Sequence, residues 1–315
     1  MIQYFTSQGR ELTKVKEPTA GCWINISPPI GQEELDLITK EHQLPPDFLT
    51  DALDSDERAR YEREDDAKLI LFSVAIENKT DREDEPMFVT EPLGIILTED
   101  DYIITISNNT NPILALFIHG KVKIDITDRK LFVLKILEHN VYRFLTSLRK
   151  LNGRRNLIEK ELYNSSRNRE LKLLLSIEKS LVYFVDALNA NELLKRKLNR
   201  TDQLEIRGQE EKEDLFEDII IDASQALAMA NLYTDILNGT METYSSIISN
   251  NLNLIIHRLT IITFILMVPT LIASFYGMNV PNGLEHNHYA FGGIILLSIL
   301  ISVFLAIFFK RNKMM

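Results

Sequence analysis

The sequence predicts an α+β membrane protein, with an N-terminal α/β domain, a long helical stalk and two C-terminal membrane-spanning helices. Three observations lead to this class. β-Branched and aromatic runs are confined to the first 127 residues. Apolar residues recur at three- and four-residue spacing from residue 128 onward. Two long uncharged apolar segments lie near the C-terminus.

Residues 1–127 form the predicted cytosolic α/β domain. Strand-like runs, rich in β-branched and aromatic residues, cover 21–27, 68–77, 88–97 and 101–107. Helical patterns cover 31–42 and 45–62, and the acidic stretch 81–85 is typical of a hairpin loop. The acid-rich stretch 54–68 is interpreted as a solvated helix face with Glu–Arg pairs rather than a catalytic or metal cluster.

Residues 128–209 carry two amphipathic helical patterns, which we expect to pack on a stalk helix over 210–257. No proline occurs between Glu210 and Pro269, so this third helix is predicted to continue unbroken into the membrane. A helix of more than about 60 residues is not stable alone in water. The stalk is therefore expected to lie in a bundle formed by several chains.

The membrane segments are predicted at 258–276 and 289–309, with a loop at 277–288 between them. They contain uninterrupted uncharged runs of 18 and 21 residues, and a bilayer core needs roughly 20 helical residues. Fully buried soluble helices are the alternative interpretation. A tandem pair of this length favours a membrane hairpin in a lipid bilayer.

The charges flanking the two spans predict their orientation. Arg258 precedes the first span, and a basic tail at 310–315 with Lys310, Arg311 and Lys313 follows the second, whereas the loop has no Lys or Arg. The positive-inside rule then places both termini in the cytoplasm and the loop outside, in the cell membrane. The first ten residues lack the apolar core of a signal peptide.

The residues before 251 are acidic, which bounds the function. They carry 31 Lys and Arg and 44 Asp and Glu, a formal charge of −13. Nucleic-acid binding needs a basic face, so no nucleic-acid partner is expected. Divalent cations are compatible partners. One cysteine, Cys22, excludes an intrachain disulfide. Because neither a phosphate-binding loop nor a nucleophile–base pair is visible, we expect no enzyme and no organic cofactor.

One face of the third helix carries a stripe of small polar and apolar residues, about 140° wide at about 100° per residue. Its members are Glu242, Ser246, Ser249, Asn253, Ile256, Leu259, Thr263, Met267 and Thr270. Lipid would not select two threonines on this line, whereas a water-filled passage on a bundle axis would. Serine and threonine that merely assist helix packing are the alternative.

The turn after the first span contains Gly277, Met278 and Asn279. Backbone that leaves a helix at the membrane boundary must be satisfied by protein or water. The Asn279 amide oxygen and backbone carbonyls are hard neutral ligands, which suit a hydrated Mg²⁺ that gives up its waters reluctantly.

These residues carry a family resemblance. Tyr276 to Asn279, preceded by "MVPTLIASF", resembles the signature of the CorA family of magnesium/cobalt transport proteins, and the order of domains is similar along the whole chain. The resemblance implies a homopentameric funnel whose first membrane helix lines the pore. It implies a selectivity filter of Gly277, Met278 and Asn279, a hydrophobic constriction at Ile256 and Leu259, and an acidic ring at Glu242. The remaining pore-lining positions would be Asn253, Thr263, Met267 and Thr270.

The resemblance also implies passive uptake of Mg²⁺ and Co²⁺, and Ni²⁺ as a further ion, with closure by intracellular Mg²⁺. Asp218, assisted by Asp222, would bind this regulatory ion together with an acid of the next subunit, for which Glu77 and the 81–85 loop are candidates. The loop departs from the family pattern but keeps an acid, Glu285, which would attract cations. His286 and His288 leave open a Zn²⁺ or Ni²⁺ transporter of the same fold. The sequence also leaves open a membrane-anchored sensor without transport and a membrane-anchored enzyme.

Overall fold

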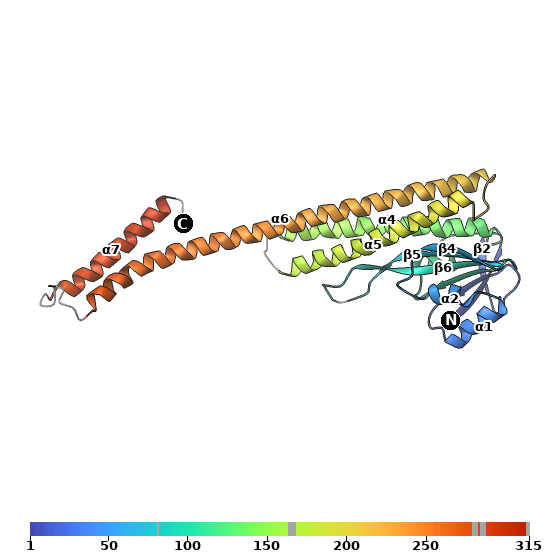
Figure 1. The fold of residues 1–315 in the computed structure, drawn as a ribbon, viewed down its shortest axis with the longest axis horizontal. Coiled ribbons are helices and arrows are strands. Elements are labelled where there is room, and N and C mark those ends of the chain that lie inside the picture. The colour runs from blue at the N-terminus through green and yellow to red at the C-terminus, as the bar shows by residue number, and fades with distance from the viewer. Residues whose placement is uncertain (81, 163–167, 279–282, 284–287, 313–315) are drawn as a thin grey trace. The chain divides into compact units, whose positions relative to one another are not determined.

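The computed structural model describes residues 1–315 apart from 81, 163–167, 279–282, 284–287 and 313–315. The chain divides into two compact units, the N-terminal unit Met1–Thr240 and the C-terminal unit Met241–Met315. Figure 1 shows the sheet and most helices in the first unit, and the end of one long helix with the last helix in the second.

A seven-stranded mixed sheet forms the centre of the N-terminal unit, in the order β2-β1-β3-β7-β6-β5-β4. Its strands are β1 (Ile2–Gln8), β2 (Glu11–Val15), β3 (Trp23–Ile26), β4 (Arg60–Glu64), β5 (Ala67–Glu77), β6 (Phe88–Thr98) and β7 (Ile103–Ser107). Only β3 and β7 run parallel; the other described neighbours are antiparallel. The four predicted strand runs are confirmed, and the 81–85 stretch lies in the β5–β6 hairpin connection as predicted.

Two short helices, α1 (Gln32–Glu41) and α2 (Pro46–Asp51), cover one face of the sheet. Their buried Leu35, Ile38 and Phe48 share a core with alternate strand residues, as the two-residue period of a strand requires. Gly94 of β6 permits the close approach, because a Cβ there would lie 2.7 Å from the Cβ of Ala52.

Three further helices are α3 (Pro112–Ile118), α4 (Arg129–Leu162) and α5 (Asn168–Thr201). α4 packs against β5, α5 packs against β4, β5 and β6, and α3 packs against α4. The ring of Trp23 lies 5.0 Å from that of Phe132 in α4, at centroid distance. Polar bonds fix the docking of both long helices: Asn140 of α4 and Asn191 of α5 each donate to the Ser73 carbonyl, at 3.1 and 2.8 Å.

The helix α6 (Glu210–Tyr276) begins in the N-terminal unit and is unbroken through Pro269, as predicted. Residues at helical spacing are buried along its first part: Phe216, Ile219, Ala223, Ala226, Ala230 and Leu237. Between these buried positions, the Ser224 hydroxyl of α6 donates to the Glu192 carboxylate of α5 at 3.0 Å.

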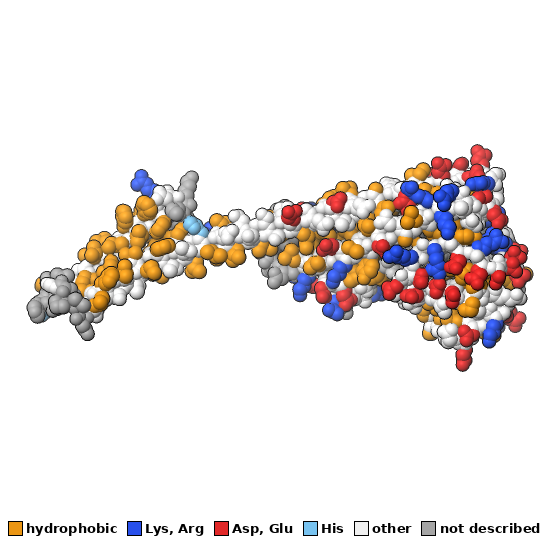
Figure 2. All heavy atoms as spheres, viewed as in Figure 1, with side chains coloured by type: hydrophobic (Ala, Val, Ile, Leu, Met, Phe, Trp, Pro, Cys, Tyr) orange, Lys and Arg blue, Asp and Glu red, His pale blue; other side chains and the backbone are white. Residues whose placement is uncertain are grey.

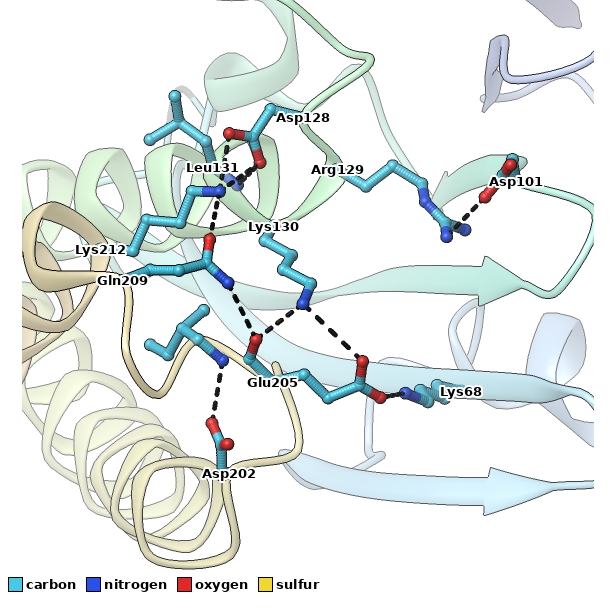
Figure 3. A network of polar contacts seen from close by, with 11 residues as sticks. Lys68, Asp101, Asp128, Arg129, Lys130, Leu131, Asp202, Glu205, Gln209 and Lys212 are labelled. Carbon is cyan, nitrogen blue, oxygen red and sulfur yellow. Dashed lines mark hydrogen bonds and ion pairs between the residues drawn. The ribbon is translucent and has the colours of Figure 1, made fainter.

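A polar network holds the α5–α6 connection to the sheet and to α4 (Figure 3). The Glu205 carboxylate accepts a 2.6 Å hydrogen bond from Lys68 of β5, and Lys130 of α4 donates to the Glu205 carbonyl at 2.6 Å. Lys212 of α6 pairs with Asp128 at 2.7 Å. The α5–α6 connection is therefore bonded to β5 and α4, and the first turn of α6 is bonded to the residue that precedes α4.

In the C-terminal unit, the end of α6 and the helix α7 (Ala290–Arg311) are both long and apolar enough to cross a membrane, with mean hydropathies of 2.1 and 2.8 over their most apolar windows. Figure 2 shows hydrophobic atoms over these helices, and most of the charged side chains on the N-terminal unit.

Three strands were absent from the sequence interpretation or misassigned in it. β1 and β2 were not predicted, and the helical pattern 45–62 is wrong beyond Ala52, since residues 60–64 form β4. Alternation explains β4: Tyr61 is buried opposite Ile70 while its neighbours are more exposed. The acid-rich stretch 54–68 is thus a turn and a hairpin rather than a helix face, and Arg60 pairs there with Asp51, Glu57 and Glu62.

Candidate ion pathway

The end of α6 has two opposite faces. The face toward α7 carries its least exposed side chains, with Ile261 buried and the others half-buried: Ile261, Ile265, Val268, Ile272 and Tyr276. At about 100° per residue, the polar stripe lies roughly 180° away from this face. Since α7 covers one side of α6, the stripe is the side left for other molecules.

Every described member of the stripe is exposed in the single chain: Glu242, Ser246, Ser249, Asn253, Ile256, Leu259, Thr263, Met267 and Thr270. At its N-terminal end, five of the six residues lining a shallow depression are uncharged and polar, and Glu242 is the sixth. Farther along, Ile256, Leu259 and Met267 are 51%, 62% and 59% exposed. Along this face of α6, the Glu242 carboxylate is thus followed first by polar residues and then by mostly apolar ones.

The two stripe threonines present oxygen acceptors. The Thr263 hydroxyl donates to the Leu259 carbonyl and the Thr270 hydroxyl to the Leu266 carbonyl, both at 2.9 Å. Because each hydroxyl proton is used within the helix, the remaining lone pairs can only accept hydrogen bonds. Water molecules around a cation point their protons outward, so this face suits a hydrated cation better than an anion.

The predicted filter lies partly within the described residues. The Gly277 amide donates to the Ala273 carbonyl at 2.9 Å and closes the last turn of α6, and Met278 is 53% exposed. A Cβ at Gly277 would stand 3.3 Å from that same carbonyl oxygen, a tight contact. Asn279 and Glu285, as well as His286, lie outside the described residues.

The predicted regulatory acids, Asp218 and Asp222, are exposed one turn apart on α6. They line a cavity of about 300 Å³ together with Glu138 of α4. Glu138 was missed by sequence reasoning, because nothing in its own helix marks it as a partner of residues some eighty positions later. It already pairs with Lys135 at 2.8 Å.

The partner acids considered from the sequence are engaged elsewhere within the chain. Glu77 pairs with Lys150 at 2.5 Å, and Glu83 pairs with Arg169 at 2.7 Å. Within the part of the chain that the structure describes, no three His, Cys, Asp or Glu side chains are arranged to hold a metal ion.

The chain resembles known transport proteins over its whole length. It is 21% identical to the cobalt/magnesium transport protein CorA of Thermotoga maritima, over 99% of this chain and 88% of that protein. The complete structure of the CorA magnesium transporter from Methanocaldococcus jannaschii matches with a TM-score of 0.79 and 24% identity, covering 99% of this chain and 98% of that one. The ZntB cytoplasmic domain from Vibrio parahaemolyticus matches with a TM-score of 0.52 and 11% identity, over 76% of this chain and 98% of that one.

A protein-family comparison gives the same result. The model of the CorA-like Mg²⁺ transporter proteins matches residues 19–311, which include most of the sheet, the long helices and both apolar segments. The protein belongs to the CorA-like Mg²⁺ transporter family.

Proposed function

We propose that this protein is a passive divalent-cation channel of the cell membrane that admits Mg²⁺, and also Co²⁺ and Ni²⁺, as hydrated ions. The observation that carries the proposal is the stripe on α6, which faces away from α7 and combines Glu242, polar amides and acceptor-only threonines. Five copies of α6 around one axis would turn these exposed faces toward each other and line a wet passage.

In this arrangement both termini lie in the cytoplasm and the Gly277–Met278–Asn279 turn lies outside. The amide of Asn279 and the carbonyl of Gly277 would meet an ion that keeps its waters, since Mg²⁺ dehydrates reluctantly. Leu259 and Ile256 would form the narrow apolar level that conducts only when wet. Glu242 would concentrate cations at the inner mouth.

The driving force is the membrane potential. A charge moved through 100 mV gains about 2.3 kcal/mol, so a divalent ion gains roughly 4.6 kcal/mol on entering a negative cytoplasm. Uptake therefore needs no ATP hydrolysis. It needs a means of closure, which we assign to intracellular Mg²⁺ held at Asp218 and Asp222 together with acids of the adjacent subunit.

Flux assays on purified protein in liposomes test the proposal. We expect uptake of Mg²⁺, Co²⁺ and Ni²⁺, block by cobalt hexammine, and strong loss of Mg²⁺ uptake in Asn279→Ala. Unchanged uptake and block in Asn279→Ala would refute the filter assignment. Five copies of 36.3 kDa give about 180 kDa, which native mass spectrometry measures directly.

Closure is tested separately with Asp218→Lys. Because a fixed cation replaces the proposed regulatory ligand, we expect this channel to lose sensitivity to Mg²⁺ on the cytoplasmic side while keeping its uptake at low Mg²⁺. Glu217→Lys is the matched control, since Glu217 is an exposed acid of the same helix turn that does not line the Asp218 cavity. Wild-type sensitivity in Asp218→Lys would contradict the assignment.

A zinc or nickel transporter of the same fold is the second candidate. Two histidines in the connecting loop, His286 and His288, favour it, because imidazole suits Zn²⁺ and Ni²⁺. Uptake of Zn²⁺ faster than Mg²⁺ under matched gradients would decide for this candidate.

A further inference from the structure

Pro269 removes one backbone hydrogen bond from the middle of the apolar part of α6. A proline has no amide proton, so the carbonyl four residues earlier, that of Ile265, has no helical i+4 donor. Within a bilayer there is no bulk water to replace it, and such carbonyls are satisfied by neighbouring helices or by serine and threonine side chains. The Ile265 carbonyl therefore needs a donor from another group of the hairpin.

A serine of the adjacent helix stands at this position. The Ser302 hydroxyl of α7 lies 3.5 Å from the Ile265 carbonyl and 3.0 Å from the Ser298 carbonyl of its own helix. A hydroxyl has one proton, so it donates to one of these carbonyls at a time. Ser302 can therefore exchange between a bond within α7 and a bond across to α6.

The same level of the hairpin carries an apolar groove between its two helices. The groove, of about 610 Å³, is lined by Pro269, Ala273 and Gly277 of α6 and by Ile295, Ser298 and Ser302 of α7. It extends along α6 from the proline to the turn where the helix ends. Few side chains therefore hold the last two turns of α6 to α7 beyond Pro269, where proline weakens the helix.

We propose that Ser302 is a positioning residue for ion conduction: its hydroxyl donates across to the Ile265 carbonyl freed by Pro269 and sets the tilt of the pore-facing end of α6. This inference rests on the proposed channel function. Ser302 does not touch the ion. It acts through α6, whose opposite face carries Met267 and Thr270.

A double-mutant cycle in the full-length protein tests this role. Ser302→Ala is expected to lower initial Mg²⁺ uptake into liposomes by about threefold to tenfold, the range of one cross-helix hydrogen bond. Ser302→Thr keeps the hydroxyl and is expected to restore uptake. In the Pro269→Ala background an amide proton again serves the Ile265 carbonyl, so adding Ser302→Ala is expected to have no further effect.

Ser298→Ala is the matched control, because it removes a hydroxyl from the same face of α7 one turn away while keeping the Ser298 carbonyl. We expect it to leave uptake within about twofold of the wild type, since no bond to α6 is lost. Equal losses from Ser302→Ala in the wild-type and Pro269→Ala backgrounds, or equal losses from Ser298→Ala and Ser302→Ala, would overturn the proposal.

The same four proteins of the cycle, unfolded thermally in detergent, give a readout that does not depend on transport. A destabilisation by Ser302→Ala that vanishes in the Pro269→Ala background supports the bond to Ile265, and additive effects refute it. If the wild type carries no ion at all, the proposed function fails while this cycle still decides whether Ser302 serves the freed carbonyl.

Discussion

The two units of this chain bury their apolar residues to very different degrees. In the N-terminal unit, Phe72 and Phe132 are at most 1% exposed. Polar side chains such as Asn191 donate hydrogen bonds to strand carbonyls that lie more than a hundred positions away in the sequence. In the C-terminal unit, Leu259, Phe264 and Leu266 are 62%, 54% and 63% exposed. Only 6% of each apolar window is buried within the chain.

The difference separates what one chain determines from what its surroundings complete. The N-terminal unit has a packed core and long-range hydrogen bonds between its helices and strands, so its own contacts determine its fold. In the C-terminal unit, α6 and α7 expose mostly apolar side chains wherever they do not contact each other, and such a surface is stable in lipid or against further copies. The polar stripe is the exception on that surface, since lipid satisfies neither amides nor hydroxyls.

The largest predicted effect comes from a fixed charge on the stripe. Thr270→Lys is expected to reduce Mg²⁺ uptake by more than about 100-fold, because a lysine about 6 Å from a divalent ion repels it by several kcal/mol at an effective dielectric constant near 20. Initial rates in liposomes measure this effect. Thr270→Ser keeps the acceptor oxygen and is the control, with uptake expected near that of the wild type. Normal uptake by Thr270→Lys would show that the stripe does not line the pathway.

The next prediction compares one aromatic truncation in each unit. Phe132→Ala, which removes a buried ring in contact with Trp23 and Phe117, is expected to cost about 3–5 kcal/mol of unfolding free energy. Phe264→Ala, at an exposed position on α6, is expected to cost less than about 1 kcal/mol. Calorimetry of the full-length protein in detergent measures both. An equal cost for Phe264→Ala would mean that another copy covers this face tightly.

Sequence patterns predicted the elements with the strongest hydrophobic signal. β5, β6 and β7 are β-branched and apolar runs that are buried at most positions, and the three- and four-residue spacing in α4, α5 and α6 indicates a buried face. β4 was misassigned because charged residues flank Tyr61 on both sides and resemble a solvated helix. β2 at the sheet edge and its neighbour β1 were not predicted, because most of their residues are half-buried or exposed and carry little hydrophobic signal.

Residues of the candidate site that share one helix could be grouped from the sequence, whereas residues brought together from two helices could not. The stripe from Glu242 to Thr270 follows from helical spacing alone, and its exposure on the face opposite α7 agrees with that interpretation. The nearness of Glu138 to Asp218, and of Ser302 to Ile265, depends on the register between helices. A single sequence contains no signal for that register.

Replacing a buried lysine of the N-terminal unit is expected to stabilise the protein, with a smaller change in unfolding free energy. Lys195 is 1% exposed, and burial lowers its pKa from 10.5 to about 8, with Glu192 acting in the opposite direction. The folded state therefore binds this proton less tightly than the unfolded state, which costs stability below pH 8. Lys195→Met is expected to raise the unfolding free energy at pH 7 by about 1–3 kcal/mol.

The pH dependence provides the check on Lys195. As pH rises from about 8 toward 10.5, the wild-type lysine loses its proton in the folded state and the penalty disappears. The stability gap between Lys195→Met and the wild type should therefore narrow over this range, measured by thermal unfolding. Lys197→Met, on the same helix turn but exposed, is the control and should show no such narrowing. A destabilised Lys195→Met protein would contradict the prediction.

The smallest effect is expected at the network that ties down the α5–α6 connection. The hydrogen bond from Lys68, followed by its charge, lowers the pKa of Glu205 from 4.5, so the ionised carboxylate stabilises the fold above that pH and the contribution is lost as pH falls below it. The side chain is 61% exposed, and solvent screening limits the effect of Glu205→Gln to under about 1 kcal/mol at pH 7. Glu99 is an exposed acid that lines one surface cavity together with Glu205. Glu99→Gln is therefore the control, and it should leave the unfolding free energy unchanged. Lys130 donates to the Glu205 backbone carbonyl, so Glu205→Gln should leave the α5–α6 connection in place. A loss of several kcal/mol of unfolding free energy would mean that the carboxylate alone fixes the start of α6.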